Sequence, residues 1–199
     1  MQDMDCMATP ISSATVLAFA DSIELEGIDA LSTPRTLAGW LAGALPGSGE
    51  AAEIALRLAE FRAVRDAIRA VLDARADGHD LPQGSVDLLN GASRGVATVL
   101  ALDDRSELRA LPFAARRGAA SVIGELARSC IVMVGGPEKR QLRRCGARGC
   151  GRFFLASRDA QRWCSAACGN RTRVARHHER VRAARGDRAS DPARLDFPA

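Results

Sequence analysis

Two cysteine pairs near the C-terminus decide how this sequence is understood: Cys145-Gly-Ala-Arg-Gly-Cys150 and, after thirteen intervening residues, Cys164-Ser-Ala-Ala-Cys168-Gly-Asn-Arg171. These pairs hold four of the six cysteines in the chain. Structural zinc is bound by four thiolate or imidazole ligands at the corners of a tetrahedron, and two close pairs joined by a short connection supply such corners. The spacing therefore predicts one structural Zn²⁺ ion, bound by Cys145, Cys150, Cys164 and Cys168.

The surroundings of the pairs favour zinc over its alternatives, which are two disulfides or four unrelated buried residues. Gly146, Gly149 and Gly151 suit tight turns around a metal, because glycine tolerates positive φ. Disulfides suit an oxidising compartment, whereas the N-terminus lacks the basic stretch and apolar run of a secretory signal. No segment reaches the roughly 18 uninterrupted apolar residues of a membrane helix. We expect a cytoplasmic, nucleoid-associated protein.

Charge is distributed unevenly along the 199 residues. The segment from Met1 to Gly136 has a net charge of −6, and the segment from Pro137 to Arg188 has a net charge of +11. Such asymmetry is typical of an acidic body fused to a module with an acidic partner such as nucleic acid. We predict an N-terminal domain at 1–136, a zinc module at 137–188 and a tail at 189–199.

Helical signals dominate the N-terminal part, since apolar residues recur there at three- and four-residue steps between capping residues. The predicted helices are one that begins at Pro34 with Thr33 as its N-cap, one from Glu50 to Ala76 ended by Gly78, a short one with Asn90-Gly91 as its C-cap, and one from Phe113 to Val134 stopped by Gly135-Gly136-Pro137.

Two apolar segments are less regular. Thr15–Ile23 fits either a strand or a buried helix, because periodicity does not separate the two in so short a run. Gly95–Leu102 is β-branched enough to predict a strand. The predicted fold is mainly α: a multihelical N-terminal domain with minor β structure, then a small four-cysteine zinc finger followed by a basic helix.

Arg65 projects near the middle of the apolar face of the long Glu50–Ala76 helix. A charge there is costly unless it is paired. Either the guanidinium reaches water at the edge of the apolar stripe, or it has a buried partner, for which Asp21 is the candidate.

The basic module contains a predicted helix from Asn170 to Arg185. On a helical wheel Val174, His178 and Val181 share one face, which we expect to dock, and Arg173, Arg176 and Arg180 share the opposite one. Arginine pairs bidentately with phosphate or guanine, so these arginines are nucleic-acid candidates, as are Asn170 and Arg171. A solvated charged face is the alternative.

Aromatic residues flank the second and third cysteines. Phe153, Phe154, Leu155 and Trp163 supply a small core for the zinc module, or else stack on exposed bases as in RNA and single-strand binders. The segment 152–155 is expected to form a short strand. Four cysteines leave no open position on zinc, and no nucleophilic or phosphate-binding motif occurs, so we expect no enzymatic activity.

These residues resemble a known family. The run from Arg144 to Arg180, above all Cys168-Gly-Asn-Arg171, is similar to the CGNR zinc finger, in which four cysteines bind zinc. The N-terminal part resembles the ABATE domain that usually precedes this finger, in bacterial proteins regarded as stress-induced transcription regulators. Leu17-Ala-Phe-Ala-Asp-Ser22 takes the place of the family's Leu-Asp-Phe-Val-Asn-Thr.

The resemblance implies a transcription regulator that binds DNA through its zinc module, with an N-terminal domain that senses a small-molecule or protein signal or forms a homodimer. The chain departs from the family at Ala18 and Asp21, so a ligand pocket that includes Asp21 and Arg65 would be altered here. The alternative is a protein or RNA interaction module in which zinc is purely structural.

Overall fold

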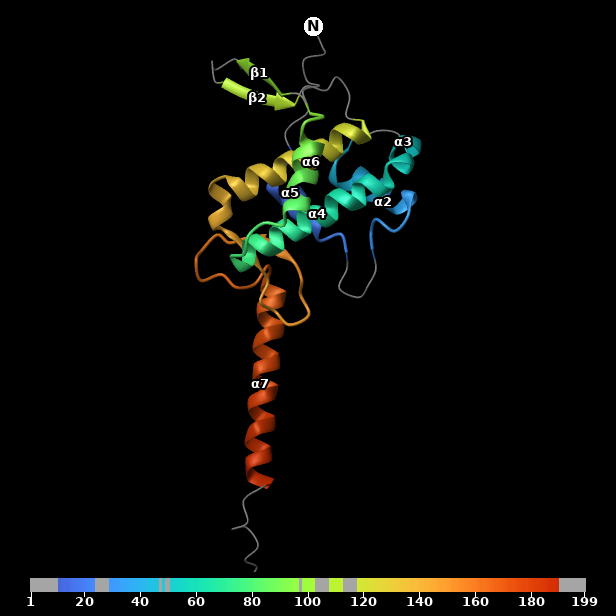
Figure 1. Cartoon of the computed structure of the whole chain (residues 1–199). Coiled ribbons are helices and arrows are strands. Elements are labelled where there is room, and N and C mark those ends of the chain that lie inside the picture. Colours follow the sequence, from blue (N-terminus) through green and yellow to red (C-terminus); the bar gives the residue numbers. More distant parts are fainter. Residues whose placement is uncertain are drawn as a thin grey trace, which may run out of the picture.

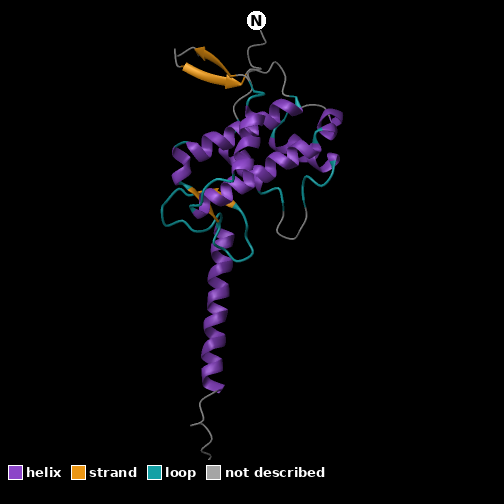
Figure 2. Ribbon diagram, in the orientation of Figure 1, coloured by secondary structure: helices purple, strands orange, loops and turns teal. Residues whose placement is uncertain are grey.

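The computed structural model describes residues 11–23, 29–46, 48, 51–96, 98–102, 108–112 and 118–189. The protein is mainly helical, as predicted, and its helices form a body from which one long helix extends (Figures 1 and 2). In the described ranges no helix is both long and apolar enough to span a membrane. The first ten residues of the predicted N-terminal domain and residues 190–199 of the predicted tail lie outside these ranges.

The body is built on three helices that pack on one another: α4 (Leu58–Asp77), α5 (Gln83–Ser93) and α6 (Ala119–Gly135). The short helix α1 (Ser13–Ala20) packs against both α4 and α6. Phe19 of α1, Phe61 of α4 and Leu126 of α6 are fully buried in the shared core. The apolar segment that begins at Thr15, which the periodicity could not assign to a strand or a helix, therefore forms the buried helix α1.

Helix α2 (Pro34–Ala44) begins as its sequence predicts. The Thr33 hydroxyl accepts a hydrogen bond from the Thr36 amide at 3.2 Å, and the Thr36 hydroxyl accepts one from the Thr33 amide at 3.0 Å. This reciprocal capping satisfies two backbone donors at the start of the helix. The buried side chains of α2 are Leu37 and Leu41.

The predicted helix from Glu50 to Ala76 is wrong as one element, because the chain leaves helical geometry at Arg57. Helix α3 (Ala51–Leu56) precedes the break and packs on α2. The Glu53 carboxylate accepts a hydrogen bond from the Ala119 amide at the start of α6, at 2.8 Å. These tertiary contacts turn α3 away from the axis of α4. The predicted end is confirmed, since Gly78 caps α4 with φ of 73°.

The predicted C-cap at Asn90-Gly91 is also wrong, because α5 continues to Ser93. The end of α5 packs closely on α6. A Cβ on Gly124 of α6 would lie 3.0 Å from the Ala92 carbonyl oxygen and 2.2 Å from Val96 Cγ2. This packing keeps Gly91 inside α5, although a glycine within a helix costs roughly 1 kcal/mol relative to alanine.

Two antiparallel hairpins complete the described structure. Strand β1 (Thr98–Leu102) covers part of the predicted strand and pairs with β2 (Leu108–Pro112), which the sequence reasoning missed. This hairpin lies at the opposite end of the molecule from the long helix (Figure 1). Beyond α6, the 3-10 turn η1 (Pro137–Arg140) leads into β3 (Leu142–Arg144), which pairs with β4 (Phe153–Leu155).

Helix α7 (Ala166–Ala189) is the long helix that leaves the body. It begins four residues before the predicted start, so that Cys168 lies in its first turn. At 1.5 Å per residue its 24 residues span about 36 Å.

Candidate metal centre and basic helix

The four predicted ligands converge at one point, since the Sγ atoms of Cys145, Cys150, Cys164 and Cys168 all lie within 4.8 Å of one another. The Cys150–Cys164 and Cys164–Cys168 separations are 3.8 and 3.7 Å. A tetrahedron with Zn–S bonds of about 2.3 Å requires S–S separations of about 3.8 Å. The donors therefore fit one zinc ion. The five described cysteines, including Cys130, are free thiols, and Cys130 is a buried core residue as predicted.

Backbone hydrogen bonds hold the first cysteine pair in place. Cys145 follows β3 directly, and its amide donates to the Arg152 carbonyl oxygen across the hairpin at 2.9 Å. The Cys150 amide donates to the Ala147 carbonyl oxygen at 2.9 Å, which closes a turn, and Gly149 in that turn has φ of 72°. Glycine is needed here because other residues rarely adopt positive φ. The hairpin and its turn thus aim both thiols at one point.

The four thiols do not ionise equally. Hydrogen bonding with Ser165, and then with the three neighbouring thiols, lowers the pKa of Cys168 to about 7. Burial, and then hydrogen bonds to the other thiols, raises the pKa of Cys164 to about 12. Zinc binds thiolates, so it must displace protons from this cluster. Zinc affinity is therefore expected to increase with pH.

Two residues of the Cys168-Gly-Asn-Arg171 motif support the metal centre. A Cβ on Gly169 would lie 3.4 Å from Cε3 of Trp163, so glycine lets the indole ring pack against the start of α7. Arg171 Nη2 donates to Cys168 Sγ at 3.6 Å, and a cation there favours the thiolate. Asn170 is exposed on the same turn.

The aromatic residues pack into two different cores. Phe154 and Trp163 pack with the cysteines, as expected for the core of the zinc module. Phe153 and Leu155, together with Leu142 of β3, instead join the core of the helical body. Adjacent residues on a strand point to opposite faces, so Phe153 and Phe154 place the hairpin between the two cores.

Two arginines lie over the ring of Phe153. The guanidinium carbons of Arg69 on α4 and Arg144 on β3 lie 5.7 and 5.9 Å from its ring centroid. The Phe153 amide donates to Asp21 Oδ1 at 3.4 Å, and Arg69 Nη1 lies 3.9 Å from the same oxygen. Burial raises the pKa of Asp21 to about 6, although the Phe153 amide and the charges of Arg69 and Arg152 lower it.

A second group of charges joins the hairpin to α4. Arg144 Nη2 lies 2.6 Å from Asp73 Oδ1 and 2.9 Å from Asp77 Oδ2. The sequence reasoning missed Arg69, Asp73 and Asp77. Their four-residue spacing places them on one face of α4, which is a signal that the sequence contains. The contacts cross the domain boundary predicted at residue 136, and that boundary stays a prediction.

The predicted pairing of Arg65 with Asp21 is wrong. The Arg65 side chain is 4% exposed, and its guanidinium bonds to both carboxylate oxygens of Asp29 and, at 3.2 Å, to Asp66. The hydrogen bond from Arg65 lowers the pKa of Asp29. Asp21 is committed to Arg69 and Phe153 at the end of α1, and so the two predicted pocket residues belong to different charge clusters.

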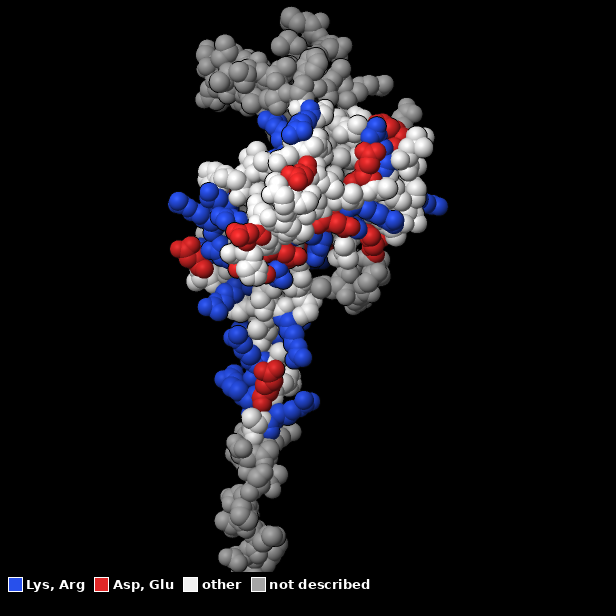
Figure 3. All heavy atoms as spheres, in the orientation of Figure 1, with Lys and Arg blue, Asp and Glu red and all other residues white. Residues whose placement is uncertain are grey.

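Every α7 arginine up to Arg182 is exposed in the part of the chain that the structure describes. Arg173, Arg176 and Arg180 line one shallow groove along the helix, together with Glu179 and Ala183. Figure 3 shows basic side chains at several levels along α7. The docking predicted for the opposite face is wrong, because Val174 is 47% exposed and His178 is exposed. Figure 1 shows the helix pointing away from the body.

Comparison with known families accounts for most of the chain. Residues 13–137 match the ABATE family, described as "Putative stress-induced transcription regulator". The chain belongs to the ABATE family. Residues 141–181 match the CGNR zinc finger, a range that covers the four clustered cysteines and the first two thirds of α7. Neither family is described as an enzyme. A search of curated proteins found no match.

Proposed function

We propose that this ABATE protein is a transcription regulator that binds DNA through α7. Arg173, Arg176 and Arg180 contact backbone phosphates, while Asn170 and Arg171 approach the DNA nearest to the metal. Zinc holds the first turn of α7 against the β3–β4 hairpin and so fixes the direction in which the helix points. Basic side chains supply most of the affinity, as is usual for contacts to phosphate.

One observation supports this proposal most: a 24-residue helix leaves the body with three arginines in a single exposed groove. An α-helix fits the major groove of B-DNA, which is about 12 Å wide. On α4, Arg62, Arg65 and Arg69 bond to carboxylates or carbonyl oxygens of the body. On α7 the bonds of Arg171 and Arg180 run to groups of α7 itself, and neither arginine pairs with an acidic residue of the body within the described ranges.

Fluorescence anisotropy with labelled duplex DNA tests the proposal. The variant Arg176→Ala with Arg180→Ala removes two basic groups from α7, and Arg35→Ala with Arg94→Ala removes two exposed ones from the body. We expect the α7 variant to bind at least tenfold more weakly at 100 mM salt. Each lost phosphate contact should also reduce the slope of log K against log salt by about 0.9.

The control variant should bind like the wild type. Equal losses in the two variants would mean that net charge, and not α7, binds DNA. A zinc-loaded wild type that binds no duplex at low salt would overturn the proposal in favour of a protein or RNA interaction module. Zinc removal with a chelator should abolish binding, because it releases the base of α7.

A further inference from the structure

A cavity of about 420 Å³ lies between α4, α5 and α6, and neither Asp21 nor Arg65, the two predicted pocket residues, is among its lining residues. Pockets for small ligands are usually clefts of about 300–1,000 Å³. The wall formed by α4 includes Glu60 and Val64, the wall formed by α5 includes Leu88 and Ala92, and α6 contributes Ile123. This cavity is independent of the metal centre and of α7.

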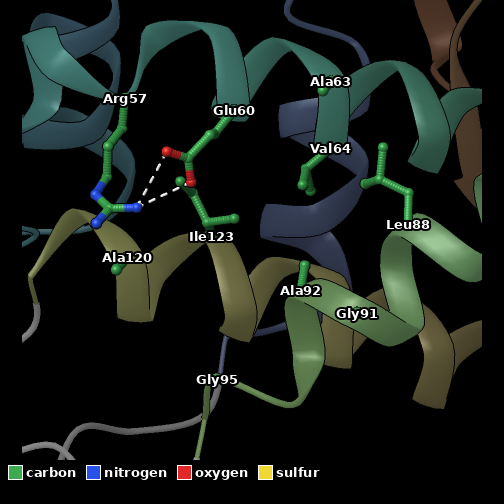
Figure 4. Close-up of a pocket in the computed structure, with 10 residues that line it drawn as sticks. All are labelled: Arg57, Glu60, Ala63, Val64, Leu88, Gly91, Ala92, Gly95, Ala120 and Ile123. Carbon is green, nitrogen blue, oxygen red and sulfur yellow. Dashed lines mark hydrogen bonds and ion pairs between the residues drawn. The ribbon is translucent and has the colours of Figure 1, made fainter.

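The interior of the cavity is apolar. Figure 4 shows the side chains of Val64, Leu88 and Ala92 pointing into one shared space between α4 and α5. Gly91 lies beside Ala92 in the lining and adds no side chain there. A surface of small and branched aliphatic groups gains free energy by covering a hydrocarbon body of matching size, at about 25 cal/mol per Å² removed from water.

Among the described lining residues only Arg57 and Glu60 are charged, and they pair with each other at one end of the cavity. Arg57 Nη1 donates to both carboxylate oxygens of Glu60, at 3.1 and 2.9 Å. Both contacts use one nitrogen of the guanidinium, which has five N–H donors in all, and a carboxylate has about four acceptor positions. The pair can therefore bond to a ligand without separating.

The charges of the pair cancel at the position where a ligand headgroup would lie. An anion attracted by Arg57 is repelled by Glu60 over a similar distance. A cation attracted by Glu60 is likewise repelled by Arg57. A charged headgroup would also lose part of its hydration without gaining a counter-ion. A hydroxyl or amide loses less hydration and can bond to both partners.

We propose that this cavity binds a small uncharged amphipathic molecule, with an aliphatic body among Val64, Leu88 and Ile123 and one hydrogen-bonding headgroup at the Arg57–Glu60 pair. The inference does not depend on DNA binding, and its experiments use neither DNA nor any change in the zinc site.

Three probes with the same hydrocarbon body and different charge test the choice of ligand. Isothermal titration calorimetry on the zinc-loaded full chain would compare 1-octanol, octanoate and octylammonium. We expect 1-octanol to bind at one site per chain, at least tenfold more tightly than either ion. Binding of an ion that equals or exceeds that of 1-octanol, or the absence of 1-octanol binding at its solubility limit, would overturn the proposal.

Neutralising one member of the pair should shift the ligand preference from 1-octanol toward the ion whose charge is opposite to that of the remaining member. Glu60→Gln leaves Arg57 without its counter-charge, so octanoate should gain at least fivefold relative to 1-octanol. Arg57→Gln leaves Glu60 unmatched, so octylammonium should gain by a similar factor. Both residues are at the surface, which makes folding of the variants expected: their side chains are 38% and 55% exposed. Unchanged selectivity in both variants would contradict a headgroup site at this pair.

Filling the cavity tests its location. Ala92→Phe and Ala63→Trp add bulk from α5 and from α4, and each should weaken 1-octanol binding at least tenfold. Ala63 is exposed, so Ala63→Trp keeps the test valid if Ala92→Phe does not fold. Ala175→Trp, on the exposed part of α7, is the matched control and should bind like the wild type. Retained binding in a folded Ala63→Trp variant places the ligand elsewhere and overturns the inference.

Discussion

The two longest helices, α4 and α7, both contain several arginines, yet they behave in opposite ways. On α4, Arg65 is buried with Asp29, and Arg69 donates to the Ala20 carbonyl oxygen at 2.6 Å. On α7, Arg173 and Arg176 are exposed to solvent. The difference lies in the residues between the arginines. Helix α4 places Phe61, Ile68 and Leu72 on one face and is drawn into the core. Helix α7 offers Val174 and Val181, too little apolar surface to be buried.

The comparison implies that α4 is stabilised by the body, whereas α7 is stabilised at its base by zinc. Cys164→Ala should therefore have the largest effect on stability, because structural zinc sites contribute roughly 10–16 kcal/mol of binding free energy. We expect loss of the single bound zinc and a lower melting temperature for the whole chain, since Phe153 belongs to the body core. Elemental analysis would measure the zinc content, and circular dichroism would measure the melting temperature.

Cys130→Ala is the control for that variant, because Cys130 is a fully buried thiol of α6 outside the metal centre. It should retain one zinc per chain and lose only the modest stability of a small core truncation. Equal zinc content in the Cys164→Ala variant and the wild type would contradict the assignment of the four ligands.

The next largest effect is expected from the arginine that α4 buries. Arg65→Ala removes the ion-pair partner of the partly exposed Asp29 and opens space in the core, so we expect a loss between about 1 kcal/mol, as for an exposed pair, and about 3 kcal/mol, as for a fully buried one. Urea denaturation would measure this loss. Arg176→Ala on α7 is the matched change, and we expect a change in stability within about 0.5 kcal/mol. Similar losses in both variants would remove the distinction between the two helices.

The smallest effect concerns Asp21, where α1 and α4 meet the hairpin. Its pKa of about 6 in the folded protein exceeds the ordinary value of 3.8, so the native state holds this proton to higher pH than the unfolded chain. The contribution of Asp21 to stability is thus greatest below about pH 4 and is lost as pH rises to about 6, with a slope of at most about 1.4 kcal/mol per pH unit.

Asp21→Asn should remove this slope, because the amide oxygen can still accept from the Phe153 amide but does not titrate. Urea midpoints of the variant and the wild type between pH 4 and pH 8 would show it. A stability difference between the two that does not vary over this range would mean that the Asp21 carboxyl titrates at its ordinary pKa in the folded chain.

The zinc centre was predictable because metal ligation fixes residue type and spacing together, so that Cys145 and Cys168 are recognisable from the sequence alone. The partner of Arg65 was not predictable, since both Asp21 and Asp29 precede α4 and only the packing of α1 decides between them. The break at Arg57 and the extension of α5 past Gly91 depend on the Glu53–Ala119 and Ala92–Gly124 contacts, each of which joins residues far apart in sequence. The Asp73–Asp77 spacing was present in the sequence but needed the hairpin as its partner.

Because Phe153 anchors the β3–β4 hairpin in the body core, a small rotation of the hairpin would produce a large displacement at the far end of α7. The hairpin that carries this ring is seated on α1 and α4, and the zinc centre on the same hairpin holds the base of a helix about 36 Å long. A rotation of the hairpin by about 10° would carry the far end of α7 through about 6 Å, close to the rise of one helical turn. Under the proposed DNA binding, Arg180 would then meet a different part of the phosphate backbone, whereas Asn170 beside the metal would hardly move.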